Sequence, residues 1–496
     1  MGFEFGIIQL LVSFLGVAIG IIFGALPGMT ATMAIAVFLP LTYAYDLSTS
    51  LYLLLGLYVG GISGGLVPAI LINIPGTPSS VTTGFDGHPM AKRGEGVRAL
   101  RIGITVSLLG GLFSLVVLWL FTPVLADLAI KFSAVEKFLI ILFAMTVIAA
   151  LSKGHMTKGI FAGFLGVFVS LMGVFADNQT MRLVPDLFKI GLRDGFQLLP
   201  VLIGLFAFSQ LFEESELGMK QAIVKEDMLK ADQTKKFSFR DLKGQTVNII
   251  RSSAIGTFMG ILPGIGGSAA SLLAYSQAKN FSKEPEKLGT GAIEGLVASE
   301  SSNNGLTGGA LVPLLSLGIP GDSTTAVLVG AFMLQGIQVG PLFITQNPGL
   351  WRTILFGLFI ANILMFIVMF YPIKYIANII KIPKYRLYPA IILLCVVGAL
   401  STRNGNMVDV MTLILFGLVG YVFTKMKVPV TTFLIGFILG RDLEKYFVDS
   451  LKGSAGSLSV FFSRPIGNFI WVLILISLAY AYYDNRKFSN TLKKAA

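Results

Sequence analysis

The sequence predicts an all-α polytopic membrane protein built from two inverted-topology repeats, with broken or re-entrant helices and about 12 transmembrane segments. Three observations support this fold class. Hydrophobic residues make up 54% of the 496 residues and charged residues only 13%, which is far from the balance of a soluble domain. A pair of Pro-Gly motifs occurs once in each half of the chain. The basic residues gather in a few loops, as they do in membrane proteins of fixed orientation.

Apolar stretches of about 20 residues are long enough to cross the hydrocarbon core of a bilayer as helices. The clearest predicted spans are residues 102–125, 355–371 and 466–483, and others lie at 138–152, 159–176, 196–212 and 387–400. Small residues spaced four apart let helix backbones approach closely. We therefore interpret two glycine series as packing positions: Gly16, Gly20 and Gly24, and Gly256, Gly260 and Gly264.

Each half of the chain carries two interrupted helices. The first motif is GIIFGALPGMTATMA from Gly20 to Ala34, and GTFMGILPGIGGSAA from Gly256 to Ala270. The second motif is GGLVPAILINIPGTPSS from Gly64 to Ser80, and GGALVPLLSLGIPGDSTT from Gly308 to Thr325. Pro and Gly interrupt a membrane helix, and interruptions at matching places in two halves are the best sequence indication of a transporter's binding site.

The second motif predicts two helices that restart inside the membrane. Thr77 is a good N-cap with Pro78 at the first helical position, and Asp322 is a good N-cap in the other half. Each restart leaves free N–H groups and the positive end of a helix dipole, which suit a carboxylate. The alternative is that these residues only cap helices, or bond the preceding turn. The predicted substrate-binding residues are Asn73, Gly76, Thr77, Ser79, Ser80, Gly321, Ser323, Thr324 and Thr325.

Asp322 has no acidic counterpart in the first half, where Thr77 stands. A carboxylate inside a membrane needs a partner, which here is a sodium ion, a proton or a basic side chain. Because it would repel a carboxylate substrate, we favour a coupling-ion or purely capping role. Amides at the ends of broken helices suit Na+, while Glu300 is interpreted as lying at a cytoplasmic or cavity rim. The predicted coupling-ion residues are Asp322, Asn303, Asn304, Gly28, Thr30, Gly264 and Ser268; the last four have flexible corners as their alternative role.

The charges predict the orientation and the domains. Lys92, Arg93, Arg98 and Arg101 place one loop in the cytoplasm, whereas the corresponding loop at 335–351 has no Lys or Arg and is placed outside. The predicted parts are a first membrane repeat at 1–212, a charged cytoplasmic linker at 213–249, a second repeat at 250–445, and a C-terminal helix with a basic tail at 446–496. The N-terminus is then periplasmic and the C-terminus cytoplasmic. A miscount of one helix would make the repeats parallel.

Other functional classes find less support in the sequence. The net charge of +12 is explained by the topology rule, so nucleic acid is not predicted as a partner. The single cysteine, Cys395, excludes a disulfide framework and is expected to be a small core residue. Residues 61–65 match G-x-S-x-G, which raises an intramembrane serine protease with Ser63 as nucleophile, but His88 and His155 are the only histidines and both lie beside basic loops. A channel is the other alternative. No cofactor is predicted except Na+ as a coupling ion, and no enzyme activity is predicted.

The motifs resemble those of the large membrane subunit of the tripartite tricarboxylate transporter family. The resemblance runs over nearly the whole chain through GALPG at 24–28, IPGTPSS at 74–80, FDGHPMAKRGEG at 85–96, GILPGIGG at 260–267, ESSNNG at 300–305 and GIPGDSTTAVLVGA at 318–331. It implies cation-driven import of citrate-like carboxylates across a bacterial inner membrane. It also implies a small four-helix membrane subunit and a periplasmic solute-binding protein as partners, and suggests an elevator-type movement.

Overall fold

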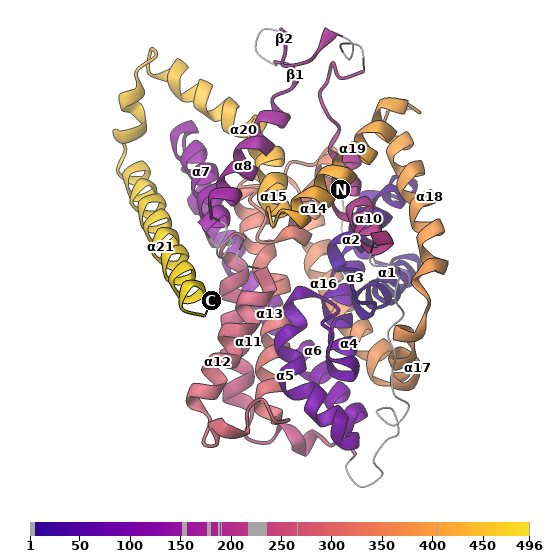
Figure 1. Ribbon diagram of the computed structural model, residues 1–496. Helices are drawn as coiled ribbons and strands as arrows, with labels where there is room; N and C mark the ends of the chain where they lie inside the picture. The colour runs from indigo at the N-terminus through magenta and orange to yellow at the C-terminus, as the bar shows by residue number, and fades with distance from the viewer. Residues whose placement is uncertain are drawn as a thin grey trace. The chain divides into compact units, whose positions relative to one another are not determined.

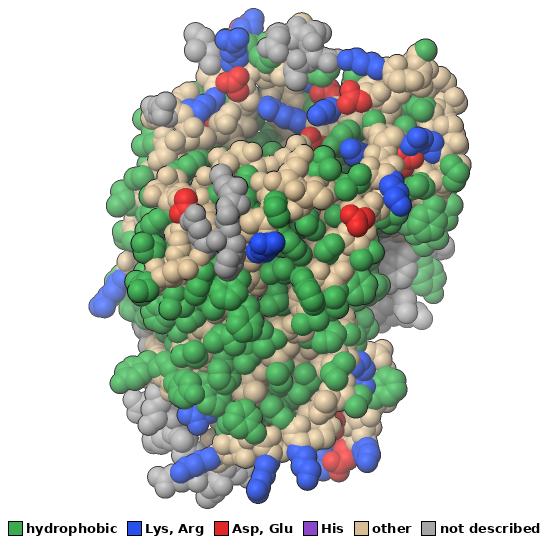
Figure 2. Space-filling model, turned by 180° about the vertical axis from the view of Figure 1, so that it is seen from behind, with side chains coloured by type: hydrophobic (Ala, Val, Ile, Leu, Met, Phe, Trp, Pro, Cys, Tyr) green, Lys and Arg blue, Asp and Glu red, His purple; other side chains and the backbone are tan. Residues whose placement is uncertain are grey.

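The computed structural model describes residues 5–150, 156–175, 180–186, 189, 191–216, 236–264, 266–403 and 405–495. Helices dominate this part of the chain (Figure 1). Seven of the described helices are long and apolar enough to cross a membrane, judged by length and composition. Figure 2 shows a face on which hydrophobic side chains cover a broad area, while most Lys and Arg side chains gather outside that area. The predicted class, an all-α polytopic membrane protein, is confirmed.

The chain divides into two compact units, and each half of the sequence contributes to both. Unit 1 consists of residues 1–126 and 213–394, and unit 2 of residues 127–212 and 395–496. Each half therefore places its N-terminal part in unit 1 and its C-terminal part in unit 2. Both Pro-Gly motifs of both halves belong to unit 1.

Unit 1 contains two similar series of helices. From the first half come α1 (Ile7–Ala25), α2 (Ala31–Phe38), η1 (Leu39–Ala44), α3 (Leu47–Gly64), α4 (Leu66–Ile72), η2 (Pro78–Ser80), α5 (Val81–Met90), η3 (Ala91–Glu95) and most of α6 (Gly96–Ile130). From the second half come η7 (Phe239–Leu242), α11 (Thr246–Ile261), α12 (Gly266–Phe281), η8 (Pro285–Lys287), α13 (Ile293–Leu317), α14 (Ser323–Leu334), α15 (Phe343–Gln346), α16 (Pro348–Phe370), α17 (Ile373–Asn378), η9 (Ile379–Lys381) and the first part of α18 (Lys384–Thr402).

Unit 2 contains the helices that follow these series. They are α7 (Ala134–Ala150), α8 (Met156–Ser170), α9 (Leu198–Ile203), η5 (Gly204–Phe208), α10 (Ser209–Glu216), α19 (Met407–Lys425), α20 (Val430–Gly453), η10 (Leu458–Phe462) and α21 (Pro465–Ala495). The predicted span at 159–176 is too long, because α8 ends at Ser170 and an antiparallel hairpin of β1 (Gly173–Val174) and β2 (Met181–Arg182) follows. Cys395 is a free, buried core residue, as predicted.

The predicted packing glycines on α1 and α11 lie at the contacts of two equivalent helix pairs. The prediction is wrong for Gly264, which lies beyond the end of α11 in a turn with φ 80°. On α1, a Cβ built on Gly20 would lie 2.6 Å from the carbonyl oxygen of Leu57 on α3. On α11, a Cβ built on Gly256 would lie 2.1 Å from the carbonyl oxygen of Ser302 on α13. Helices that approach this closely tolerate no side chain at the contact, which explains the four-residue spacing of the glycines on α1 and of Gly256 and Gly260 on α11.

The ends of α4 and α13 also repeat the same local geometry. Asn73 ends α4 with φ 55°, and Gly318 ends α13 with φ 76°. In each case the N–H of the next residue donates to a proline carbonyl six residues back: Ile74 to Pro68, and Ile319 to Pro313. This left-handed helix end is a common way to satisfy terminal carbonyls, and it turns the chain toward the Pro-Gly step in both halves.

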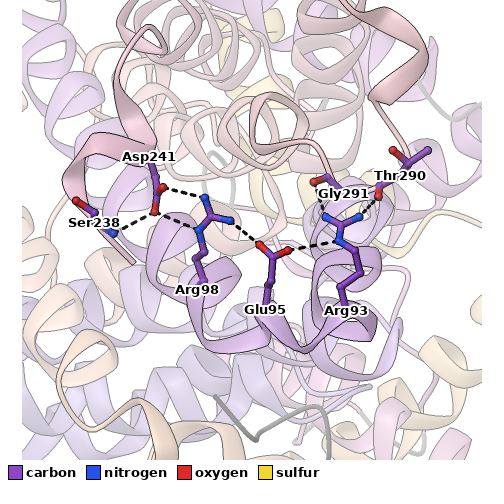
Figure 3. Close-up of polar contacts among 7 residues, drawn as sticks. All are labelled: Arg93, Glu95, Arg98, Ser238, Asp241, Thr290 and Gly291. Carbon is purple, nitrogen blue, oxygen red and sulfur yellow. Dashed lines mark hydrogen bonds and ion pairs between the residues drawn. The ribbon is translucent and has the colours of Figure 1, made fainter. Parts of the chain in front are cut away.

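A network of charged side chains fastens the corner between α5 and α6 to two other segments of unit 1 (Figure 3). The Arg98 guanidinium donates to both carboxylate oxygens of Asp241, at 2.8 and 3.3 Å, and to Glu95. On the other side of Glu95, Arg93 donates to the backbone carbonyls of Thr290 and Gly291. The described end of the predicted linker, around Asp241, is therefore bound to the corner; residues 217–235 of that linker lie outside the described part.

The Arg98–Asp241 contact predicts a pH-dependent contribution to stability. The hydrogen bond from Arg98 holds the pKa of the Asp241 carboxyl below its ordinary value. A lowered pKa in the folded state means that the contribution is present at neutral pH and is lost as the pH falls through that lowered pKa. We expect Asp241→Asn to lower stability by about 1 kcal/mol at pH 7, with the difference from the wild type shrinking below pH about 4. Thermal unfolding of the purified protein at several pH values tests this.

The exposed pair Glu284–Lys287 offers a matched control for that measurement. Its side chains are 57% and 61% exposed, respectively, and exposed ion pairs add little to stability. We expect Glu284→Gln to leave the unfolding temperature nearly unchanged. An equal loss in Glu284→Gln and Asp241→Asn would contradict a specific role for the corner network.

Candidate functional site

Four helices of unit 1 begin at the interrupted motifs. They are α2, the continuous pair η2 and α5, α12, and α14. We call their first residues the helix-start ring: residues 28–32, 76–80, 264, 266–268 and 321–325. In the first motif of each half, the glycine that follows the proline has a left-handed backbone conformation: Gly28 at φ 88° and Gly264 at φ 80°. Glycine adopts this conformation without strain, which explains why it follows the proline in both halves.

Within each half, the two interruptions touch through backbone atoms. A Cβ built on Gly76 would lie 2.0 Å from the carbonyl oxygen of Gly24. In the second half, a Cβ built on Gly321 would lie 2.5 Å from the carbonyl oxygen of Gly260, and the N–H of Gly264 donates to the carbonyl of Gly321 at 2.7 Å. In both halves, therefore, the glycine of the second Pro-Gly step packs against the end of the helix that precedes the first step.

Two further contacts join the halves and close the ring. The Thr32 hydroxyl at the start of α2 hydrogen-bonds the Thr324 hydroxyl at the start of α14, at 2.9 Å. On the other side, a Cβ built on Gly267 at the start of α12 would lie 2.4 Å from Cβ of Ser79. Each half thus places its first motif against the second motif of the other half, and all four helix starts meet in one place.

The two predicted helix caps are confirmed. The Ser80 hydroxyl accepts from the Thr77 N–H at 3.2 Å and donates to the Thr77 carbonyl at 2.8 Å. In the second half, the Asp322 carboxylate accepts from the Thr325 N–H and from the Thr325 hydroxyl, both at 2.7 Å. Both are reciprocal capping boxes. The one charged side chain among the ring residues is Asp322, so the two halves present chemically different helix starts.

The ring is polar and partly open. Thr77, Ser79, Ser80, Asp322, Thr324 and Thr325 are buried, Gly28, Thr30 and Ser323 are half-buried, and Ser268 is exposed. Thr30 caps α2 by accepting from the Met33 N–H at 3.1 Å. Four positive helix-dipole ends with hydroxyl groups and one carboxylate therefore lie together, some of them reachable from outside the protein. All the predicted substrate residues except Asn73 belong to this cluster; Asn73 lies outside it, exposed at the end of α4.

The predicted coupling-ion residues do not form a single group. Asn303 and Asn304 lie in the interior of α13, both completely buried, rather than at the end of a broken helix. Asn304 is six residues before Ala310, against which Gly321 packs, so it lies about 9 Å along the helix from that contact. The Asn304 amide oxygen accepts a hydrogen bond from the Ser63 hydroxyl of α3 at 2.6 Å.

The expectation that Glu300 lies at a rim is wrong. Its side chain is completely buried, and it accepts hydrogen bonds from Thr83 at 2.5 Å and Ser107 at 2.9 Å. Sequence reasoning missed this because Thr83 is 217 and Ser107 193 residues away along the chain. The only signal in the sequence was a carboxylate placed in a run of small polar residues.

The protease alternative receives no support from the described contacts. The Ser63 hydroxyl donates to an amide oxygen, which is not a base, and Nδ1 of His88 lies 3.0 Å from the carbonyl oxygen of Ile70. His155 lies outside the described residues. Among the side chains that the structure describes, no group of three or more His, Cys, Asp and Glu residues is placed to hold a metal ion.

The fold and the ring of helix starts define a polytopic membrane protein built around paired broken helices, as transporters are. The chain belongs to the tripartite tricarboxylate transporter TctA family, whose sequence model matches residues 10–435. It is 34% identical over 481 residues to a protein of Agrobacterium vitis named "Uncharacterized 52.8 kDa protein in TAR-I ttuC' 3'region", a match that covers 94% of this chain and 92% of that protein. A second Agrobacterium vitis protein, from the TAR-II ttuC' 3' region, is 39% identical over 211 residues, which are 42% of this chain and 87% of that protein. No solved structure matches the chain.

Proposed function

We propose that this chain is the large membrane subunit of a binding-protein-dependent secondary transporter that imports di- or tricarboxylates such as citrate with a coupling cation. The observation that carries the proposal is the closed ring of four helix starts. Free N–H groups and positive dipole ends at a helix start favour negative charge. Family membership supports transport as the activity, since the family belongs to three-component carboxylate transporters.

The difference between the two halves suggests which part of the ring binds the substrate and which part binds the cation. The start of η2 is capped by the neutral Thr77, whereas the start of α14 already carries the Asp322 carboxylate. A carboxylate substrate would be repelled at Asp322, so we place it at the Thr77 side with Ser79 and Ser80. The coupling cation is placed beside Asp322, whose helix start contacts the start of α2 through the Thr32–Thr324 hydrogen bond.

The division into two units supports a moving part in this mechanism. Unit 1 holds all four helix starts, and α6, α10 and α18 continue from one unit into the other. We propose an elevator-type movement in which unit 1 carries the substrate while unit 2 stays with the bilayer. The proposed setting is a bacterial inner membrane, with inverted repeats, a periplasmic N-terminus and a cytoplasmic C-terminus. A small four-helix membrane subunit and a periplasmic solute-binding protein are the proposed partners.

Uptake into proteoliposomes tests the proposal. The vesicles hold this chain with its small partner subunit, and labelled citrate and a panel of mono- and dicarboxylates are offered with and without loaded binding protein. We expect uptake that requires the binding protein and an imposed Na+ or proton gradient. Gradient-independent flux would favour a channel, and the absence of any anion uptake by a folded complex would refute the proposal.

Replacing Asp322 by Asn tests its proposed ion-binding role. Asn remains a good N-cap, so α14 should still form, while the charge that would hold a cation is removed. We expect the cation concentration that gives half-maximal uptake to rise about tenfold or more, which corresponds to about 1.4 kcal/mol of lost binding. The matched control is Thr77→Asn, which changes the equivalent cap without changing its charge. Wild-type cation dependence in Asp322→Asn would leave Asp322 as a cap only.

A further inference from the structure

A second buried carboxylate in unit 1 lies outside the helix-start ring. Glu300 is completely buried in α13, and none of the ion pairs among the described residues includes it. Its carboxylate accepts from the Thr83 hydroxyl on α5 and from the Ser107 hydroxyl on α6. A buried carboxylate with hydroxyl donors and no cation is costly, because hydroxyl groups do not compensate a full charge.

A buried amide whose oxygen has no donor lies at the same place. Asn303 is also completely buried, and both its amide nitrogen and its amide oxygen lack a hydrogen bond of normal geometry, although the amide is close enough to Glu300 to interact with its carboxylate. Buried amides are nearly always satisfied, so an open Oδ1 beside a carboxylate needs an explanation. Carboxylate, amide and hydroxyl oxygens together are the ligands that hard cations prefer.

The charged and titratable side chains on the surrounding helices are engaged elsewhere. On α5, Asp86 accepts from the N–H groups of Gly289, Gly291 and Ala292 and from Tyr275 of α12, and His88 contacts the Ile70 carbonyl. Arg101 of α6 lies over the Phe370 ring, and Arg251 of α11 contacts Asn248 and the Phe281 ring. Tyr58 of α3 is close to Asp322, and Lys279 of α12 is exposed. None of these contacts neutralises Glu300.

We propose that Glu300, Asn303, Thr83 and Ser107 form a second site for a monovalent cation, either Na+ or a proton. This inference rests on the proposed function, because it gives the transporter two binding sites for coupling cations, one beside Asp322 and one at Glu300.

The Glu300 cluster is connected to the helix-start ring by packed groups. Asn304 donates to the backbone carbonyl of Glu300 at 3.4 Å and accepts from Ser63 at 2.6 Å. Two residues after Ser63, a Cβ built on Gly65 would lie 2.5 Å from the Thr77 hydroxyl.

Cation binding by the purified complex in detergent tests this site without any transport. The probe is Na+ alone: the unfolding temperature is measured from low to high NaCl, with choline chloride holding the ionic strength constant. A ligand that binds only the folded state raises stability with its concentration. We expect the wild type to show such a Na+ response and Glu300→Gln to show a smaller one, because only the cation placed beside Asp322 then remains. Ser107→Ala, a smaller change, should shift the Na+ concentration of half-maximal effect about tenfold or more.

A second arm separates the proton from Na+. If the site takes only a proton, the Na+ response is the same in the wild type and in Glu300→Gln. In Na+-free buffer the wild type then loses stability with rising pH as Glu300 ionises, while Glu300→Gln does not. Either pattern supports the site and names its ion. An identical Na+ and pH response in the wild type, Glu300→Gln and Ser107→Ala overturns it. Asp322→Asn is the comparison variant, since it should leave the Glu300-dependent response in place.

Failure of this proposal and failure of the proposed function give different results. A Glu300-dependent cation response in a complex that takes up no carboxylate would support the cation site and refute the transport proposal. Carboxylate uptake whose cation dependence is the same in the wild type and in Glu300→Gln would support the transport proposal and refute the cation site at Glu300. Should Glu300→Gln fail to fold, the same comparison is made with Ser107→Ala and Thr83→Val, which keep the carboxylate.

Discussion

Replacing Ser79 by Asp should abolish carboxylate uptake while leaving the protein in the membrane. Ser79 is buried at the start of η2, on the half of the ring that lacks a carboxylate. A new negative charge there would repel a bound carboxylate by about 4 kcal/mol at a separation of 4 Å near a protein surface. This predicts a loss of affinity of at least about 100-fold. Uptake of labelled citrate by proteoliposomes, with the amount of reconstituted protein measured alongside, gives the result.

Size is the main confounding factor in that experiment. Ser79 packs against Gly267, where a Cβ would already lie 2.4 Å from Cβ of Ser79, so any larger side chain has to turn away from α12. Ser79→Asn has nearly the same shape as Ser79→Asp and no charge. We expect Ser79→Asn to keep most of the uptake. Equal loss in both variants would show that crowding, not charge, is responsible, and normal uptake by Ser79→Asp would refute the placement of the substrate.

The helix starts were predictable from the sequence because their physics is local. Proline and glycine interrupt a helix wherever they stand, and a side-chain oxygen at the N-cap satisfies N–H groups within three residues. Thr77 and Asp322 are therefore readable as caps from a few neighbouring residues. The repetition of the motifs in two halves then indicated that the interruptions serve a site.

The closing contacts of the ring were beyond sequence reasoning. Thr32 and Thr324 are separated by 292 residues, and no local rule brings them together. The same holds for Glu300, whose hydroxyl partners come from two other helices. A polar residue in an apolar helix can face a rim or a neighbouring helix equally well, and only tertiary packing decides which.

The division into two compact units could not be predicted either, because it too depends on contacts between segments far apart in the sequence. Motif repetition predicted boundaries in the order of the chain, whereas the compact units each combine segments from both halves. Cross-half contacts such as Thr32 to Thr324 and Ser79 to Gly267 place the two first segments in one unit. Two repeats that exchange their binding motifs in this way depend on each other for packing, which explains why neither half alone encloses the ring.

Replacing Gly76 by Ala should destabilise unit 1 more than any other single methyl group added to the ring. The added Cβ would lie 2.0 Å from the carbonyl oxygen of Gly24 and 2.8 Å from Cα of Gly65. These are backbone atoms of two helices, which cannot turn away as a side chain can, so the helices must separate. Overpacking of this kind costs up to about 3 kcal/mol. We expect a lower unfolding temperature and little uptake.

Two further Gly→Ala substitutions serve as comparisons: one at the equivalent glycine of the other half, and one at a glycine with room for a side chain. At Gly321 a Cβ would lie 2.5 Å from the carbonyl oxygen of Gly260, so Gly321→Ala should be destabilising too, though less than Gly76→Ala. At Gly103 on α6 the nearest atom would be Cγ of Glu300 at 3.6 Å, an ordinary contact distance, and Gly→Ala in a helix interior is mildly favourable. Gly103→Ala should therefore unfold at or above the wild-type temperature. If Gly76→Ala behaved like Gly103→Ala, the close approach of Gly76 to Gly24 and Gly65, and with it the geometry of the ring, would be wrong.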